Sequence, residues 1–316
     1  MTQEPSLLDR FRGCLLGQAV GDALGAPFET MPADAIYYGF GSVRKIVAKP
    51  PVEQLQYTDD TQMMIGVAEV LINHGRIVEV DLMRAFVENF DAGRAYGPGT
   101  HQLIDIAAKG DDWQAASKTL MPGGSFGNGA AMRAAPVGLL FHDDLDRVAY
   151  EAELSSMPTH AHAIAIDGAR AVAIAVAVAM MPRFDRRLFY NEILRRSFTS
   201  EFYNAVSRAA ELAATDYLGE LGTSLEAHRS VPTAIACFAS HPDSYPETIA
   251  RAIALGGDVD TLAAIAGAIS GAHLSINAIP PHLLAMLEND AKGRDYIDGL
   301  AAQLFERFNS SGGRDA

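Results

Sequence analysis

The chain has 316 residues, of which 49% are hydrophobic and 20% are charged, and its 39 acidic and 25 basic side chains give a formal net charge of -14. A chain of this length buries enough apolar surface to fold unaided, and the acidic balance argues against two partners recognised through phosphate charge, nucleic acid and anionic membrane surfaces. Only Cys14 and Cys237 are present, and the start lacks a basic region followed by an apolar stretch, so we expect no disulfide framework, no secretory signal and a cytoplasmic location.

Most of the chain is predicted to be helical, because long segments rich in Ala, Leu, Ile and Met run without Gly or Pro and lack the alternating pattern of strands. The first helix is expected at about residues 6–23, with Ser6 as its N-cap. Further helices are predicted at residues 60–74, 79–91, 99–109, 111–119, 128–140, 144–156, 162–181, 186–196, 200–216, 225–239, 245–254, 260–275, 281–287 and 292–308. Glycine or proline is expected to interrupt them at Gly75, Gly110, Pro122, Pro182 and Gly222. Residues 42–48 are predicted to form a short edge strand.

The most apolar segment, residues 169–181, is too short to cross a membrane, which takes ~20 residues. Asp167 and Arg170 interrupt it on one side and Pro182 ends it on the other, so we interpret it as a buried core helix. No Gly-, Ser- or Pro-rich linker and no internal repeat divides the chain. Residues 1–316 are therefore expected to form one all-α domain, ordered over about 6–308 and monomeric.

Two acidic motifs stand at the starts of predicted helices. Residues 58–61 read Thr-Asp-Asp-Thr, and residues 256–261 read Gly-Gly-Asp-Val-Asp-Thr. Each pair of acids has a simple explanation as a helix N-cap that complements the helix dipole. A hydroxyl beside two carboxylates is also a set of hard oxygen ligands, suited to Mg²⁺ or another hard divalent cation. Gly256 and Gly257 permit positive φ, which lets acids crowd together, and two such loops facing each other would need cations between them.

A glycine-rich segment at residues 123–129 reads Gly-Gly-Ser-Phe-Gly-Asn-Gly. Its glycines could present backbone N–H groups to a phosphate, and Phe126 offers a face for a base. The segment also matches the Gly-x-Ser-x-Gly nucleophile elbow around Ser125, but that motif requires a buried strand before it, and the preceding residues do not read as one. A plain interhelical loop is the third interpretation.

Three further residues carry weaker signals. His160 and His162 precede the most apolar helix, and their spacing puts them on different helix faces, which disfavours a joint zinc site and leaves a buried or capping role. Glu29 follows the first helix, where nothing local distinguishes it from a solvated loop acid.

Taken in order, these motifs resemble the ADP-ribosylglycohydrolase family, which includes dinitrogenase-reductase-activating glycohydrolase and the eukaryotic ADP-ribosylhydrolases. The matching segments lie between residues 11 and 272 and read FRGCLLGQAVGDALGAPFE, YTDDTQM, GRAYGPGT, GGSFGNGAAMRAAPVG, THAHAIAIDGARA and GGDVDTLAAIAGAISGA. The resemblance implies an all-α fold with a central binuclear metal site holding two Mg²⁺ ions, or Mn²⁺ in some members. It also implies hydrolysis of an ADP-ribosylated protein or another ADP-ribose conjugate.

The resemblance also assigns roles to residues. The metal ligands that it implies are Thr58, Asp59, Asp60, Asp258, Asp260 and Thr261. The implied ADP-ribose contacts are Glu29, Tyr96 and Gly97 near the ribose, Gly124, Ser125, Gly127 and Asn128 at the diphosphate, Phe126 at the adenosine, and His160 at the phosphate or ribose. For the catalytic carboxylate that accepts a proton from water we expect Glu29, with Asp60 and Asp258 as the next candidates. Arg133 is either a further contact of the site or part of a structural ion pair, and we favour the ion pair.

The linkage that is cleaved depends on loops. Dinitrogenase-reductase-activating members carry an acid in the loop that here runs from Gly93 to Thr100, and this chain has none there. The sequence of the 124–129 loop is closer to that of family members that act on serine-linked ADP-ribose, poly(ADP-ribose) or O-acetyl-ADP-ribose. Three alternatives remain: an arginine-linked ADP-ribose hydrolase, a non-catalytic ADP-ribose-binding or structural relative, and a serine hydrolase that uses Ser125. The intact set of acids favours a metal-dependent enzyme.

Overall fold

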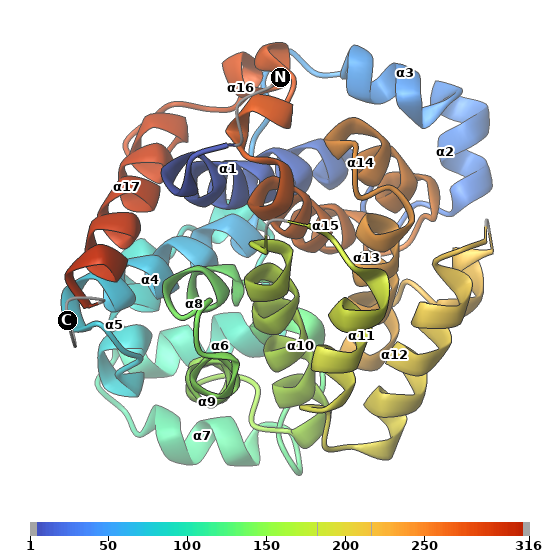
Figure 1. Ribbon diagram of the computed structural model, residues 1–316. Helices are drawn as coiled ribbons and strands as arrows, with labels where there is room; N and C mark the ends of the chain where they lie inside the picture. The colour runs from blue at the N-terminus through green and yellow to red at the C-terminus, as the bar shows by residue number, and fades with distance from the viewer. Residues whose placement is uncertain (1–4, 182, 216, 312–316) are drawn as a thin grey trace.

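The computed structural model describes residues 5–181, 183–215 and 217–311, and the regular elements of this part of the chain are helices (Figure 1). The α-helices are α1 (Leu7–Gly25), α2 (Ala33–Phe40), α3 (Val43–Ala48), α4 (Asp59–His74), α5 (Glu79–Asn89), α6 (Pro98–Ala108), α7 (Trp113–Thr119), α8 (Ala135–Leu140), α9 (Leu145–Ser156), α10 (Ala163–Ala179), α11 (Arg186–Leu194), α12 (Ser200–Leu212), α13 (Ala227–Ser240), α14 (Tyr245–Ala254), α15 (Val259–Leu274), α16 (Pro281–Met286) and α17 (Arg294–Ser311). Short 3₁₀ turns are η1 (Ala26–Phe28), η2 (Ala92–Arg94), η3 (Asn128–Ala130), η4 (Leu218–Leu221) and η5 (Ile276–Ala278).

The all-α prediction is confirmed, but the edge strand predicted at residues 42–48 is wrong. Val43–Ala48 forms α3, in which Val43, Ile46 and Val47 are buried while Arg44 and Lys45 are exposed. Burial at spacings of three and four residues is the period of a helix, and the run was too short for this period to stand out. Within the described residues, β-type pairing is limited to isolated bridges such as Pro32 with Gly256.

Other differences concern boundaries. The single helix predicted at residues 128–140 is wrong: η3 and a turn come first, and α8 begins only at Ala135, with Pro136 in its first turn, where the missing N–H costs nothing. The helix α2 was not predicted. The last helix, α17, extends to Ser311, beyond the ordered core expected to end at 308. Pro182 and the two chain ends, residues 1–4 and 312–316, lie outside the described residues.

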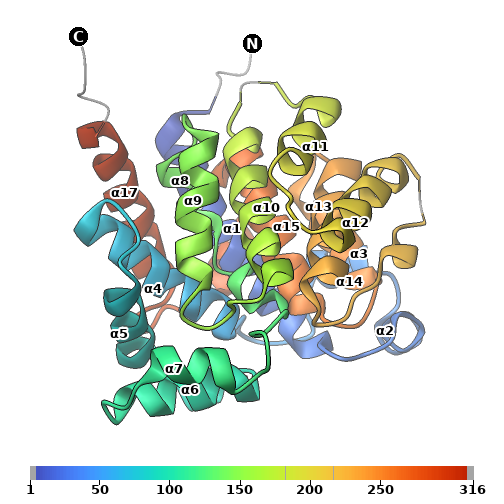
Figure 2. The same cartoon turned by 90° about the horizontal axis from the view of Figure 1, so that it is seen from below.

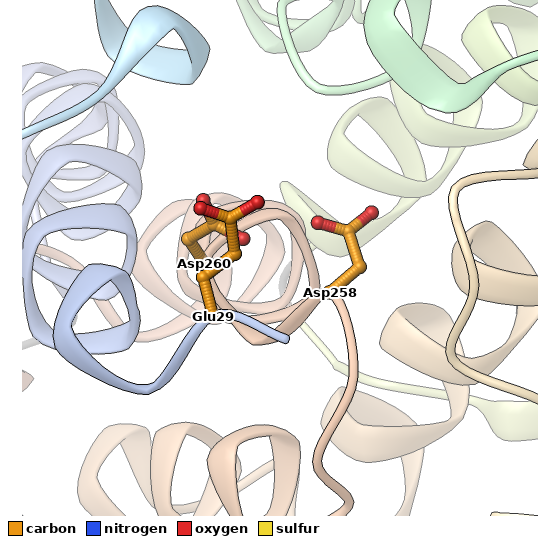
Figure 3. Close-up of side chains that lie close together, drawn as sticks. All are labelled: Glu29, Asp258 and Asp260. Carbon is orange, nitrogen blue, oxygen red and sulfur yellow. The ribbon is translucent and has the colours of Figure 1, made fainter. Parts of the chain in front are cut away.

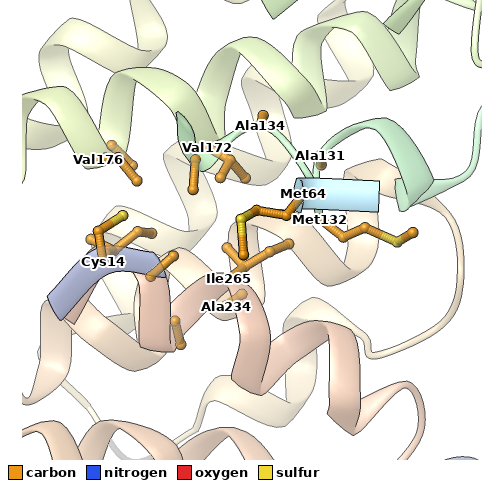
Figure 4. Packing of buried hydrophobic residues seen from close by; sticks show 14 of the residues in the cluster. Cys14, Met64, Ala131, Met132, Ala134, Val172, Val176, Ala234 and Ile265 are labelled. Carbon is orange, nitrogen blue, oxygen red and sulfur yellow. The ribbon is translucent and has the colours of Figure 1, made fainter. Parts of the chain in front are cut away.

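The core is built around α15, which packs against both α1 and α10, with α4, α5 and α17 on one side and α11, α12 and α13 on the other (Figures 1 and 2). The segment predicted to be a buried core helix is α10, and its residues from Ala171 to Ala179 are all buried. Small and flexible side chains from several helices meet against it, among them Cys14, Met64 and Ile265 (Figure 4). No helix in the described part of the chain is both long and apolar enough to span a membrane.

The closest helix pair is α1 with α15, and glycines make this contact. Gly13, Gly17 and Gly21 stand one turn apart on α1, and a Cβ atom on them would lie 2.4, 2.6 and 2.2 Å from carbonyl oxygens of α15. The facing residues of α15 come in reverse order, Gly271, Gly267 and Ala263, so the helices are antiparallel. Only residues without a side chain permit this approach. The pairing brings the end of α1 beside the start of α15.

Candidate active site

Acidic residues from distant parts of the chain meet where α1 ends and α15 begins. Glu29 follows α1, and Asp258 directly precedes α15. The two segments are joined by the backbone: the Thr30 N–H donates to the Gly257 carbonyl oxygen at 2.8 Å. This connection places Glu29 beside Asp258 and Asp260, which are more than 200 residues away in the sequence.

The two glycines before Asp258 have the positive φ that the sequence predicted. Gly256 has φ 70° and Gly257 has φ 84°. A Cβ atom would lie 2.5 Å from the Ala33 nitrogen at the first position and 2.3 Å from Thr223 Oγ1 at the second. Both conformation and space therefore require glycine, and the tight turn carries Asp258 into the cluster.

The side chains of Glu29, Asp258 and Asp260 point into one space (Figure 3), and a carboxylate oxygen from each lies within 4.8 Å of the other two. Asp258 and Asp260 are buried and Glu29 is half-buried. Burial, followed by the charges of Asp258 and Glu29, raises the pKa of Asp260 well above its ordinary value. Burial and the charge of Asp258 also raise the pKa of Glu29. The three acids therefore repel one another as they stand.

The first turn of α4 adds two more carboxylates. Burial and then the charge of Asp22 raise the pKa values of Asp59 and Asp60 well above the ordinary range. The Oδ1 atom of Asp60 is buried and has no hydrogen-bond partner in the described part of the chain. Its Oδ2 atom lies 3.3 Å from Thr58 Oγ1 and 3.5 Å from Thr261 Oγ1. An orphaned carboxylate oxygen among like charges and hydroxyls fits a hard divalent cation, because such cations prefer oxygen ligands.

Asp22 is a member of the site that the sequence analysis missed. It is fully buried on α1 and accepts hydrogen bonds from the backbone N–H and the hydroxyl of both Thr58 and Thr61, at 2.5 to 3.1 Å. Burial outweighs these bonds and raises the pKa of Asp22 to about 6. The carboxylate fixes the start of α4 and orients the Thr58 hydroxyl. Its one signal in the sequence is that it carries the only charge in the stretch from Gly13 to Gly25, which is otherwise uncharged.

A cleft with a volume of about 670 Å³ opens above the acids. Most of the predicted site residues line it: Glu29, Asp59, Asp60, Tyr96, Gly97, Ser125, Phe126, Gly127, Asn128, His160, Asp258, Asp260 and Thr261. Two predicted residues do not. Thr58 is buried behind the wall against Asp22, and Gly124 packs against the backbone, where a Cβ atom would lie 2.7 Å from the His162 nitrogen. Apolar side chains that the sequence analysis missed, Leu103, Leu120, Met121 and Leu225, complete the lining.

The glycine-rich loop is held against the start of α13. The Asn128 N–H donates to the Leu225 carbonyl oxygen at 2.9 Å, and the Ala227 N–H donates to that of Phe126 at 3.1 Å. The Asn128 side-chain amide donates to Asp258, which connects the loop to the acids. No strand precedes Ser125; α7 and a turn do. The structural context of a nucleophile elbow is therefore lacking.

The two histidines have different roles in the structure. His162 caps α10, since its Nδ1 accepts from the Ile164 N–H at 3.2 Å, and its ring packs edge-on against Phe126. His160 is buried in the cleft wall, and burial followed by the charge of Arg133 lowers its pKa to about 3. The ring is therefore neutral at physiological pH.

Arg133 does not form the ion pair that we expected. Among the described residues no carboxylate lies within ion-pair distance of it; instead it donates to Thr159 Oγ1 at 2.9 Å and to the Ser155 carbonyl oxygen at 2.6 Å. The guanidinium also lies 4.6 Å from the centre of the Phe86 ring. Burial lowers its pKa to about 9, so it remains a cation at neutral pH.

Tyr96 and Gly97 reach the cleft through a loop held by α4. The Tyr96 hydroxyl donates to Gln62 Oε1 at 2.8 Å, and this oxygen also accepts the Asp91 N–H. Ala95, just before Tyr96, has φ 62°, a left-handed conformation that is uncommon outside glycine. The loop is therefore fixed by its contacts and lines the cleft beside the acids.

Comparisons with known proteins agree on one family. The sequence model of a family described as ADP-ribosylglycohydrolase matches residues 3–314. The chain is 32% identical to ADP-ribosylhydrolase ARH3 of Danio rerio, over 96% of this chain and 91% of the relative. It is 29% identical to ADP-ribosylhydrolase ARH3 of Homo sapiens, over 96% of this chain and 95% of the relative. A solved structure described as an ADP-ribosylglycohydrolase-related protein complex has the same fold, with a TM-score of 0.70 at 24% identity, covering 96% of this chain and 99% of that one.

Proposed function

Since the chain belongs to the ADP-ribosylglycohydrolase family, we propose that it is a magnesium-dependent hydrolase that releases ADP-ribose from modified protein side chains or related conjugates. The observation that carries the proposal is a single cleft that joins a crowded carboxylate cluster to a glycine-rich loop. Of the linkages, we favour serine-linked ADP-ribose, O-acetyl-ADP-ribose or poly(ADP-ribose), because the loop at 93–100 lacks an acid.

The acids are suited to two jobs. Asp59, Asp60, Asp258, Asp260 and Thr261 would hold two Mg²⁺ ions, or Mn²⁺, with Thr58 held by Asp22 beside Asp60. When bound, such ions supply positive charge that positions sugar hydroxyls and lowers the pKa of water. The role of Glu29 or of another carboxylate is to accept the proton of the attacking water.

The bond that breaks joins C1 of the ribose to the acceptor oxygen, and charge develops on the sugar as it does in other glycosidic cleavages. Carboxylates beside C1 stabilise that positive charge. The N–H groups of Ser125 and Phe126 would hold the diphosphate, since those of Gly124, Gly127 and Asn128 already donate to Met121, Ser125 and Leu225. Phe126, which is 45% exposed, offers its face to the adenine. Tyr96 and His160 lie on the walls between these two ends.

One assay tests the proposal. The full chain is incubated with serine-linked, arginine-linked and O-acetyl-ADP-ribose substrates, with Mg²⁺ or with EDTA, and free ADP-ribose is followed by chromatography. We expect Mg²⁺-dependent release from the serine-linked or O-acetyl substrate and its loss in Asp258→Asn. Binding of ADP-ribose without release from any substrate would overturn the enzyme in favour of a reader. Release that survives both EDTA and Asp258→Asn would overturn the metal mechanism, and release from the arginine substrate alone would overturn the linkage.

A further inference from the structure

Three buried side chains lead from the core to the wall of the cleft. Arg133 Nη1 donates to Thr159 Oγ1 at 2.9 Å, and Thr159 Oγ1 lies 2.7 Å from His160 Nδ1. The other Nη group of Arg133 donates to the Ser155 carbonyl oxygen, which aims the guanidinium at the threonine hydroxyl. All three side chains are buried, so water does not compete for these bonds.

The donors available along this row of hydrogen bonds, from Arg133 through Thr159 to His160, determine which nitrogen of the histidine ring carries the proton. A guanidinium can only donate, so Thr159 Oγ1 must accept from Arg133. The threonine has one hydroxyl proton, and His160 Nδ1 is the acceptor that contacts it among the described residues. A proton on Nδ1 would leave the buried hydroxyl proton without a partner, which is unfavourable. The neutral ring therefore accepts at Nδ1 and carries its proton on Nε2.

The protonated nitrogen is on the cleft side of the ring. His160 is 6% exposed and lines the cleft. Its Nε2 lies against the glycine-rich loop, where a Cβ atom would stand 3.5 Å away at Gly127 and 2.8 Å away at Gly129. The printed side-chain hydrogen bond of His160 uses Nδ1, and within the described residues none is formed by Nε2. A largely buried donor therefore lies at the cleft wall without a protein partner.

We propose that Arg133 and Thr159 are positioning residues that lock His160 as a neutral Nε2–H donor, and that this donor serves a ligand oxygen that can only accept, namely a phosphoryl oxygen, since only such an oxygen requires a fixed tautomer. A ribose hydroxyl both donates and accepts and would bind either tautomer, whereas a phosphoryl oxygen at neutral pH is bound only by the Nε2–H form. The charge of the Arg133 guanidinium polarises the hydrogen bonds to Thr159 and His160, which makes the His160 Nε2–H a stronger donor. The choice of diphosphate as the ligand group rests on the proposed function; the tautomer does not.

The test combines the tautomer with ligand affinity. Thr159→Val keeps the shape of the side chain and removes the hydroxyl, and Thr159→Ser restores the hydroxyl. Long-range ¹⁵N–¹H NMR of the His160 ring reports which nitrogen is protonated in each protein, assigned by comparison with His160→Gln. Calorimetry with Mg²⁺ present measures binding of ADP-ribose and of adenosine, which lacks phosphate. Thermal unfolding checks that the variants fold.

We expect an Nε2–H ring in the wild type and in Thr159→Ser, and a mixture of tautomers in Thr159→Val. The valine variant should bind ADP-ribose more weakly in inverse proportion to the fraction of its rings that keep the Nε2–H tautomer, about 2-fold if the two tautomers are equally populated, while adenosine binding is unchanged. An Nδ1–H ring in the wild type would overturn the proposal even if the valine variant does not fold. Equal weakening for both ligands would reduce Thr159 to a structural residue. A wild type with the Nε2–H ring but no affinity for ADP-ribose would overturn the proposed function and, with it, the phosphoryl ligand, but not the tautomer lock.

Discussion

We predict that Gly21→Ala separates α1 from α15 and weakens the metal site without touching it. The new Cβ atom would lie 2.2 Å from the Ala263 carbonyl oxygen, whereas ordinary contact begins at 3.4 Å, so the helices must move apart by about 1 Å. Overpacking of this kind costs about 1–3 kcal/mol, and alanine returns about 1 kcal/mol of helix propensity. Glu29 would move with α1 while Asp258 and Asp260 stay with α15.

The matched control is Gly299→Ala on α17, where a Cβ atom meets nothing within 4 Å. Only the propensity gain applies there, so we expect slight stabilisation. Urea unfolding should separate the two variants by the overpacking cost of about 1–3 kcal/mol, because the propensity gain is common to both. Mn²⁺ binding, followed by electron paramagnetic resonance, should weaken in Gly21→Ala alone. If the two variants have equal unfolding free energies and equal Mn²⁺ affinities, the close glycine contact does not position the site.

Three further outcomes are expected. Asp22→Asn removes the charged acceptor of four donors at the start of α4. It should lower the free energy of unfolding by about 3 kcal/mol, measured by urea unfolding. It should also weaken Mn²⁺ binding, measured by calorimetry. The pKa of His160 is lowered to about 3 in the folded protein against an unfolded value of about 6.5, so the folded state binds fewer protons and stability falls as pH drops below about 6.5. At pH 5 the loss is about 2 kcal/mol, and a urea series should find this part of the pH dependence missing in His160→Gln. Adding Mg²⁺ to a hundred times its Kd should stabilise the fold by about 2.7 kcal/mol, a gain that differential scanning calorimetry should find reduced in Asp260→Asn and absent with EDTA.

Much of the site could be read from the sequence because its residues come in compact motifs at helix starts. Asp59 and Asp60 open α4, and Asp258 and Asp260 open α15, as their positions before apolar helices predicted. The buried α10 followed from its length and composition. These features depend on neighbours in the chain, which a pattern of residues records directly.

The features that were missed depend on contacts between distant segments. Nothing near Asp22 reveals that two threonines of α4 donate to it, and nothing near Arg133 reveals that its partners are neutral. The glycines of α1 recur every fourth residue, a pattern of close helix packing that was present in the sequence, but the partner helix could not be named from it. The short α3 was mistaken for a strand because six residues hold fewer than two turns.

The electrostatics of the cluster explain why these acids lie at helix starts and why that position alone is insufficient. A helix N-terminus stabilises a nearby carboxylate by about 0.3–2 kcal/mol, and α4 and α15 both direct this end toward the site. Two unit charges 4.8 Å apart repel by about 3.5 kcal/mol at an effective dielectric constant of 20. Glu29, Asp258 and Asp260 form three such pairs, so the repulsion exceeds what two helix ends offset. Burial, followed by this repulsion, raises the pKa values of Glu29 and Asp260. Divalent cations would offset the excess repulsion between the carboxylates. An approaching diphosphate would then meet bound cations and backbone N–H groups instead of bare carboxylates.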